Sequence, residues 1–206
     1  MKNAAIVHVI DDDPGIRKSL RLVMESASLE VRVYESGEEF LDAIDPRQPG
    51  CMVLDLRMPG IGGIEVLQRL RAAQIEIPAI VISGHADVPA AIRSMKLGAI
   101  DLLQKPFEPQ ALLDTVHSAI KASVDLRARR SEQESIRRRL AKLTPRELVL
   151  LKLIVAGMPN KRIAADLNIS IKTVGNHRAS LMAKTEALNA ADLARMSTVA
   201  GIIPNK

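Results

Sequence analysis

The chain has 206 residues, 47% apolar and 26% charged, which is typical of a folded globular protein rather than a disordered one. No apolar run approaches the roughly 18 residues that a membrane span requires, and no signal peptide precedes the acidic residues at Asp11. We therefore expect a cytoplasmic protein without a membrane partner. One cysteine, Cys51, excludes an intramolecular disulfide, and two Phe with one Tyr argue against a base-stacking nucleic-acid binder.

Charge divides the chain into two parts. Residues 1–121 carry 13 Lys and Arg against 17 Asp and Glu, a net charge of −4, whereas residues 122–206 carry 16 against 7, a net charge of +9. Such asymmetry indicates two modules with different partners, of which the basic one has the sign needed to meet a polyanion.

The first 121 residues alternate short apolar runs with amphipathic segments, a pattern that predicts a doubly wound (βα)₅ domain with a parallel sheet. The apolar, often β-branched runs are typical of buried parallel strands. The predicted strands are Ile6–Ile10, Val31–Tyr34, Cys51–Leu54, Ala79–Ile82 and Ala99–Leu103. The predicted helices are Ile16–Ala27, Glu38–Ile44, Ile64–Ala73, Pro89–Leu97 and Pro109–Ile120.

The remaining chain is predicted to be a linker followed by an all-helical domain. Residues 122–142 are highly charged and lack Gly and Pro, so this linker can be helical, although a solvated tether fits the pattern equally well. Residues 143–206 predict four short helices, with Thr144, Asn160 and Ser170 as N-caps of the first three. These helices are Leu148–Val155, Lys161–Leu167, Ile171–Lys184 and Ala190–Val199.

Polar residues follow the predicted strands where their carboxyl ends would meet. Asp11, Asp12 and Asp13 follow the first strand, Asp55 the third, Ser83 the fourth and Lys105 the fifth. Ligands of doubly wound sheets bind at this edge, and clustered carboxylates there suit Mg²⁺. Asp55 could then act as a carboxylate nucleophile that forms an aspartyl phosphate, with Lys105 and the Ser83 hydroxyl meeting the phosphoryl oxygens. Each residue alone could be ordinary loop polarity, but the combination in this order is specific.

These motifs resemble a known family. Residues 1–121 resemble the receiver domain of two-component response regulators, and residues 143–199 resemble the LuxR/NarL-type helix-turn-helix; the combination is similar to the FixJ subgroup. The receiver motifs are Val7-His8-Val9-Ile10-Asp11-Asp12-Asp13, Leu54-Asp55-Leu56-Arg57-Met58-Pro59-Gly60, Ser83-Gly84-His85 and Lys105-Pro106-Phe107. The helix-turn-helix motifs include Leu143-Thr144-Pro145-Arg146-Glu147, Asn160-Lys161, Ile169-Ser170 and Thr173-Val174 with His177.

The resemblance implies a role for each matched receiver residue. Asp55 is the implied phospho-acceptor, and the implied Mg²⁺ ligands are Asp11, Asp12, Asp55 and the main-chain carbonyl of Arg57. Ser83 and Lys105 match the hydroxyl and the lysine of the switch, and the Lys105–Pro106 bond is expected to be cis. Leu102 stands where the family usually has Phe or Tyr, so switching would rely on leucine packing. Asp13 matches no acidic position of the family and is expected to cap a helix. His85 could shade the phosphoryl group from water.

In the helix-turn-helix, residues 171–184 would enter the major groove of DNA. Lys161, Lys172, Arg178 and Lys184 are the expected phosphate contacts, whereas Asn176 can pair with adenine and Gly175 and Ala179 allow close approach to bases. Thr173 completes the expected contact set.

We therefore expect a transcription factor rather than a turnover enzyme. This transcription factor would accept its phosphoryl group from a sensor histidine kinase and would have the capacity to dephosphorylate itself. Phosphorylation would produce a homodimer that binds promoter DNA, with RNA polymerase as a further candidate partner. One rival is a Mg²⁺-dependent phosphohydrolase, because Asp11 and Asp13 have the Asp-x-Asp spacing of such enzymes, although no substrate-cap insertion is present. Another rival is a ligand-sensing LuxR regulator, but three aromatic residues are too few to line the acyl-chain pocket of such a protein.

Overall fold

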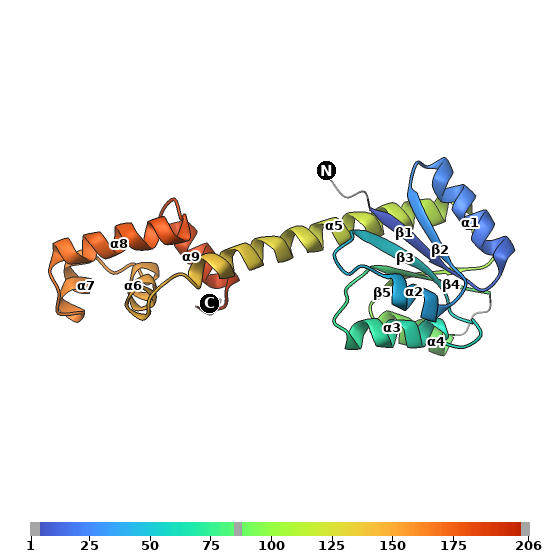
Figure 1. Ribbon diagram of the computed structural model, residues 1–206, viewed down its shortest axis with the longest axis horizontal. Coiled ribbons are helices and arrows are strands. Elements are labelled where there is room, and N and C mark those ends of the chain that lie inside the picture. Colours follow the sequence, from blue (N-terminus) through green and yellow to red (C-terminus); the bar gives the residue numbers. More distant parts are fainter. Residues whose placement is uncertain (1–4, 85–87, 203–206) are drawn as a thin grey trace. The chain divides into compact units, whose positions relative to one another are not determined.

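The computed structural model describes residues 5–84 and 88–202 and divides the chain into two units, Met1–Arg127 and Ala128–Lys206. The first unit alternates strands and helices, and the second is helical (Figure 1). The strands are β1 (Ile6–Ile10), β2 (Glu30–Tyr34), β3 (Gly50–Asp55), β4 (Ala79–Ser83) and β5 (Ala99–Gln104). The helices are α1 (Pro14–Ser26), α2 (Gly37–Ala43), α3 (Gly63–Ala72), α4 (Val88–Lys96), α5 (Pro109–Leu140), α6 (Pro145–Val155), α7 (Asn160–Asp166), α8 (Ile171–Thr185) and α9 (Ala190–Val199).

The five strands form one parallel sheet in the order β2-β1-β3-β4-β5, which confirms the predicted doubly wound fold. Helices α1 and α5 cover one face, and α2, α3 and α4 cover the other (Figure 1). Strands β1, β3 and β4 are buried along their whole length because they are central and covered on both faces. This burial explains why their sequences are continuous apolar runs instead of alternating ones.

Two separate apolar clusters form beneath these layers. Ile10, Leu54 and Val81 point to the face covered by α2, α3 and α4, whereas Val9 and Val53 point to the face of α1 and α5. The alternation places successive side chains of each strand on opposite faces. Two of the three aromatic residues, Tyr34 and Phe40, pack with His8 in the first cluster, and His8 Nδ1 lies 3.0 Å from the Tyr34 hydroxyl.

Most predicted helix starts are confirmed, with one exception. Asp13 caps α1, because its Oδ1 accepts hydrogen bonds from Gly15 N at 2.7 Å and Ile16 N at 3.2 Å. Thr144 forms the predicted capping box with Glu147, and Ser170 caps α8. The prediction that Asn160 caps α7 was wrong: Pro159 occupies the N-cap and Asn160 is the first helical residue. The Asn160 Oδ1 instead accepts a hydrogen bond from Arg178 on α8.

Helix α5 continues through most of the segment expected to be a linker, and both ends of that segment pack. In the first unit, the buried Ser123 Oγ accepts a hydrogen bond from Gly50 N, and Arg127 donates to the Pro46 carbonyl. In the second unit, Ile136 and Leu140 are buried in the core formed by α6 to α9.

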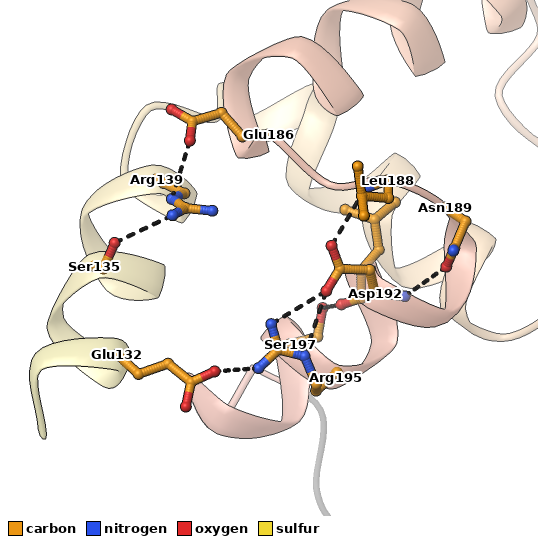
Figure 2. Close-up of polar contacts among 10 residues, drawn as sticks. Glu132, Ser135, Arg139, Glu186, Leu188, Asn189, Asp192, Arg195 and Ser197 are labelled. Atoms are coloured by element: carbon orange, nitrogen blue, oxygen red, sulfur yellow. Dashed lines mark hydrogen bonds and ion pairs between the residues drawn. The ribbon is translucent and has the colours of Figure 1, made fainter. Parts of the chain in front are cut away.

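Within the second unit, polar contacts join the last turns of α5 to α9 and to the end of α8 (Figure 2). Arg195 on α9 donates to Glu132 and also pairs with Asp192, while Arg139 pairs with Glu186 at the end of α8. These pairs are largely exposed, so each contributes little by itself, and the buried Ile136 and Leu140 supply most of the attachment. Within residues 5–84 and 88–202, no helix is both long and apolar enough to cross a membrane.

Candidate active site and nucleic-acid interface

The carboxyl ends of the parallel strands bring three charged residues into direct contact. Asp11 follows β1, Asp55 is the last residue of β3, and Lys105 follows β5. The Lys105 Nζ lies 2.9 Å from Asp11 Oδ2 and 2.7 Å from Asp55 Oδ1. One ammonium group therefore bridges two carboxylates that are 44 residues apart in the chain.

Burial sets the electrostatics of this cluster. Asp11 is 3% exposed and Asp55 8%. Burial raises the pKa of Asp11 above its usual range, against the opposing effect of the Lys105 hydrogen bond. Burial by itself would lower the pKa of Lys105, but the hydrogen bonds and charges of Asp55 and Asp11 raise it overall. The lysine is consequently held in its charged form between the two acids.

Main-chain and side-chain hydrogen bonds fix the two carboxylates. Asp11 Oδ1 accepts from Asp13 N at 2.9 Å, and Asp55 Oδ2 accepts from Arg57 N at 2.6 Å. Arg17 on α1 donates to the Asp11 carbonyl oxygen at 2.6 Å. Arg17 belongs to no motif of the sequence and was not predicted, although its place one turn after the Asp13 cap could have indicated a side chain that reaches back to the strand end.

The two switch candidates lie on the same side of the sheet. Ser83 is buried at the end of β4, and its carbonyl accepts a hydrogen bond from Lys105 N at 2.8 Å. Leu102 pairs with Val81 in the β4–β5 register and packs, half-buried, against the cluster that contains Val81. Since Val81 and Ser83 are two residues apart on one strand, Leu102 and Ser83 share a face. The Lys105–Pro106 bond is cis, as expected.

The oxygen donors at this edge fit Mg²⁺, which binds proteins through one or two carboxylates and retains several waters. Asp11 and Asp55 supply two buried carboxylates, whereas Asp12 is exposed. In the described part of the chain, no three His, Cys, Asp or Glu side chains gather into a self-sufficient metal cage. Asp13 is occupied as the cap of α1, which removes the second acid that the phosphohydrolase alternative needs. His85 lies outside the described residues.

Helix α8 presents an exposed stripe of small and polar residues. Lys172, Gly175, Asn176 and Ala179 are exposed, while Val174 and Leu181 on the opposite side are fully buried. A Cβ added at Gly175 would meet no described atom within 4 Å. The stripe follows the three- and four-residue spacing of one helix face and leaves space for a ligand to approach.

The other expected DNA contacts differ in their exposure and in their hydrogen bonds within the protein. Lys161 on α7 is exposed. Arg178 is half-buried and donates to Asn160 Oδ1 at 3.2 Å, and the Thr173 hydroxyl lies 2.8 Å from Ser170 Oγ. The Thr173 side chain thus takes part in the start of α8.

Lys184, another expected phosphate contact, is engaged inside its own unit. Its Nζ lies 2.9 Å from Glu147 Oε1 and 2.8 Å from Oε2, so the ammonium is held by a buried carboxylate of the same unit. The same carboxylate also accepts hydrogen bonds from Ser180 and Thr144. The Lys184 hydrogen bond is the main reason that the pKa of Glu147 falls to about 2. Lys184 therefore serves the packing of α6 against α8.

Family models match both units of the chain. The response regulator receiver domain matches residues 7–117, and the luxR family of bacterial regulatory proteins matches residues 141–197. Among curated proteins, the transcriptional regulatory protein FixJ of Azorhizobium caulinodans is 42% identical over 99% of this chain and 97% of that protein. Nodulation protein W of Bradyrhizobium diazoefficiens is 39% identical over 98% of this chain and 88% of that protein.

Solved structures agree with these matches. The response regulator StyR, 39% identical, has a TM-score of 0.87 and covers 94% of this chain and 98% of its own. Full-length FixJ from B. japonicum, 37% identical, has a TM-score of 0.59 over 97% and 98% of the two chains. Together with the charged cluster at the strand ends and the exposed face of α8, the matches show that the chain belongs to the two-component response regulators and is a FixJ-like transcriptional regulator with a receiver domain and a LuxR-type DNA-binding domain.

Proposed function

We propose that a sensor histidine kinase transfers a phosphoryl group to Asp55 in a Mg²⁺-dependent reaction, and that the phosphorylated chain dimerises and binds promoter DNA through α8. The observation that carries this proposal is the Lys105 ammonium that bridges the buried carboxylates of Asp11 and Asp55. A lysine shared by two acids at the ligand edge of a parallel sheet is placed to meet a third anion.

The chain's own residues then have defined roles. An Asp55 carboxylate oxygen attacks phosphorus as the bond from phosphorus to the kinase histidine nitrogen breaks, and the imidazole leaves with the electron pair. Lys105 transfers one of its contacts from Asp55 to a phosphoryl oxygen, and the Ser83 hydroxyl is within the same edge of the sheet. Bound Mg²⁺ would neutralise charge on the phosphoryl oxygens, with Asp11, Asp12, Asp55 and the Arg57 carbonyl as its proposed ligands. Slow hydrolysis of the acyl phosphate by the protein itself would return it to the resting state.

The switch is proposed to run through Ser83 and Leu102. Movement of Ser83 toward the phosphoryl group would open space on the sheet face that it shares with Leu102. Leu102 is half-buried and can move inward, where it gains dispersion contacts but offers no hydroxyl. The population shift would therefore depend on packing differences between the two states.

The exposed apolar residues of α4 and β5 support dimerisation. Ile92 and Met95 on α4 are 51% and 48% exposed, and Ile100 on β5 is 41% exposed. Helix α4 packs beside β5, so these side chains belong to one region of the receiver. Apolar residues gathered on a surface are typical of protein interfaces. In the cytoplasm, a dimer on promoter DNA would act on transcription, with RNA polymerase as the proposed further partner.

The test of phosphorylation uses a small acyl-phosphate donor and Mg²⁺ with the intact chain, read by mass spectrometry. The wild type should gain one phosphoryl group, and neither Asp55→Asn nor chelator-treated protein should gain it. Asp42→Asn, which removes an exposed acid on α2, is the matched control and should be labelled normally. Equal labelling of Asp55→Asn would overturn the assignment.

A further inference from the structure

The loop between Asp55 and α3 (residues 56–62) is held from outside by an acid on α2. Glu38 Oε1 accepts a hydrogen bond from Ile61 N at 3.1 Å, across 23 residues of sequence. Gly60, the preceding residue, has a φ of +71°, and a Cβ there would lie 2.8 Å from Glu38 Oε1. The carboxylate of Glu38 thus lies directly against the backbone of the loop, in space that a larger residue at position 60 would occupy.

The same loop is fixed near Asp55 by backbone contacts with β4 and with the start of α3. Leu56 N donates to the Ile82 carbonyl at 3.2 Å, and Gly63 N donates to the Leu56 carbonyl at 3.2 Å. A Cβ on Gly63 would lie 2.4 Å from the Asp55 carbonyl oxygen, so α3 begins in direct contact with that residue. Between these supports lies Arg57, whose N–H binds Asp55 Oδ2. Displacement of the loop at Ile61 would therefore reach Arg57 through a short backbone segment.

We propose that Glu38 is a positioning residue for the phospho-acceptor site, an inference that rests on the proposed function. Its hydrogen bond to Ile61 N holds the loop so that the Arg57 main chain is fixed toward Asp55. Without this contact the loop would sample other conformations, and the proposed carbonyl ligand of Arg57 and the Asp55 Oδ2 hydrogen bond would both be less well ordered. Outer hydrogen bonds of this kind set the orientation of metal-binding groups.

The neighbouring Glu39 separates this role from a general effect of charge at the start of α2. Glu39 closes its own turn, since its N–H donates to Ser36 Oγ at 3.1 Å and its Oε2 accepts from Glu35 N at 2.8 Å. Glu38 instead leaves the helix for a distant segment. Both residues are exposed and acidic and belong to the same turn, so they form a matched pair.

The experiment compares the intact wild-type chain with Glu38→Ala, Glu38→Gln and Glu39→Ala. Amide hydrogen exchange at Ile61 measures the contact itself, calorimetric titration of the unphosphorylated chain with Mg²⁺ measures its consequence, and thermal unfolding monitors the fold. Glu38→Ala should speed exchange at Ile61 and weaken Mg²⁺ binding roughly tenfold, at the low end of losses seen for outer hydrogen bonds of metal sites. Glu38→Gln should keep both the exchange rate at Ile61 and the Mg²⁺ affinity near the wild-type values, because a carboxamide oxygen can still accept the hydrogen bond.

Each further result has a defined meaning. Glu39→Ala should lower the unfolding temperature without changing Mg²⁺ affinity. If Glu38→Ala and Glu39→Ala weakened Mg²⁺ binding equally, the effect of Glu38 would come from its charge and not from positioning. Unchanged Mg²⁺ affinity in Glu38→Ala, with the wild type binding normally, would overturn the role of Glu38 alone. A wild-type chain that binds no Mg²⁺ would instead refute the proposed function, and with it this role.

Discussion

Each unit of the chain contains a buried carboxylate that contacts a lysine, and the two have opposite electrostatic characters. Asp11 shares Lys105 with Asp55, and burial raises its pKa. Glu147 has Lys184 to itself together with Thr144 and Ser180 as donors, and its pKa falls to about 2. The fully satisfied carboxylate is a structural feature of its unit. Asp11, whose burial is not fully offset by its hydrogen bonds, lies where the proposed chemistry takes place. Carboxylates with a shifted pKa are common at functional sites.

Replacement of Lys105 by Met should destabilise the receiver because two buried carboxylates would face each other without a cation. We expect a loss of roughly 3–5 kcal/mol in the free energy of unfolding at pH 7, the range for breaking a buried ion pair. The loss should shrink as the pH falls from 7 towards 5, because burial raises the pKa of Asp11 and its carboxylate takes up a proton more readily, and also when Mg²⁺ is added. Urea titrations at the two pH values measure this, with Lys18→Met on the exposed face of α1 as the control. A loss independent of pH and Mg²⁺ would contradict the arrangement.

Glu147 predicts a second pH dependence, at lower pH, in the DNA-binding unit. Its folded-state pKa of about 2 lies below the usual 4.5, so its stabilisation is complete above about pH 4.5 and is lost as the pH falls towards 2. Glu147→Gln should therefore be less stable than the wild type at pH 6, with a difference that narrows by pH 3. Hydrogen exchange of α6 amides measures the stability of this unit. Glu186→Gln, which removes an acid 60% exposed, should show almost no such difference.

Sequence reasoning succeeded at the residue scale where a motif is local. The positions of Asp11, Asp55 and Lys105 follow from the ends of three short apolar runs, and the Asp13 and Thr144 caps depend on atoms two or three residues away. It could not find Glu38, because the partner of this acid is 23 residues away across a loop. Nor could it find the partner of Lys184, since a basic residue near a helix end predicts charge and not the buried acid opposite it.

At the scale of elements, the exposed face of α8 makes a distinct prediction for each residue type. Lys172→Ala should weaken binding to specific and random duplex DNA alike and lower the log–log salt slope by about 0.9, because one phosphate contact is lost. Asn176→Ala should lose roughly 1–3 kcal/mol on the specific site only. Lys184→Ala should keep the salt slope and reduce thermal stability, because its ammonium is bound to Glu147.

The measurement is fluorescence anisotropy of the intact phosphorylated chain on a duplex first selected from random sequence by the wild type. If Lys184→Ala lowered the salt slope as much as Lys172→Ala, Lys184 would contact DNA phosphate despite its pair with Glu147. If Asn176→Ala lost affinity equally on all duplexes, Asn176 would contact the DNA backbone and not a base.

The alternation of elements was predictable because the three central strands, β1, β3 and β4, are buried on both faces and their sequences are therefore uninterrupted apolar runs. That the linker can be helical was also predictable, because it lacks Gly and Pro, but the choice between a continuous helix and a solvated tether was not. The apolar spacing of α5 stops near Val124, and the segment that follows is mostly charged, so hydrophobic periodicity ends there while the helix goes on to Leu140. Isolated apolar residues such as Ile136 enter the core of the second unit, and one or two such residues are too few to produce a periodic signal.

At the scale of the whole molecule, phosphorylation is predicted to change the oligomeric state through the apolar residues of α4 and β5. Met95→Glu should accept a phosphoryl group but stay monomeric in sedimentation, because a charge would be buried in the new interface. Leu22→Glu is the control, since Leu22 on α1 is 58% exposed, against 48% for Met95, and lies on the other face of the sheet. The control should dimerise like the wild type. Similar behaviour of the two variants would place the interface elsewhere.

The strand order has a consequence for how the chain is made. The first strand synthesised, β1, lies between β2 and β3, and β4 and β5 then add outward in the order in which they are translated. Every new strand after β3 can therefore join the exposed edge of a sheet that already exists. At roughly 5–20 residues per second, the ribosome needs about 4–16 s more to complete the second unit, which is about 80 residues long. The receiver can thus be folded, with its acids and lysine in place, while the helix that would read DNA is still being translated.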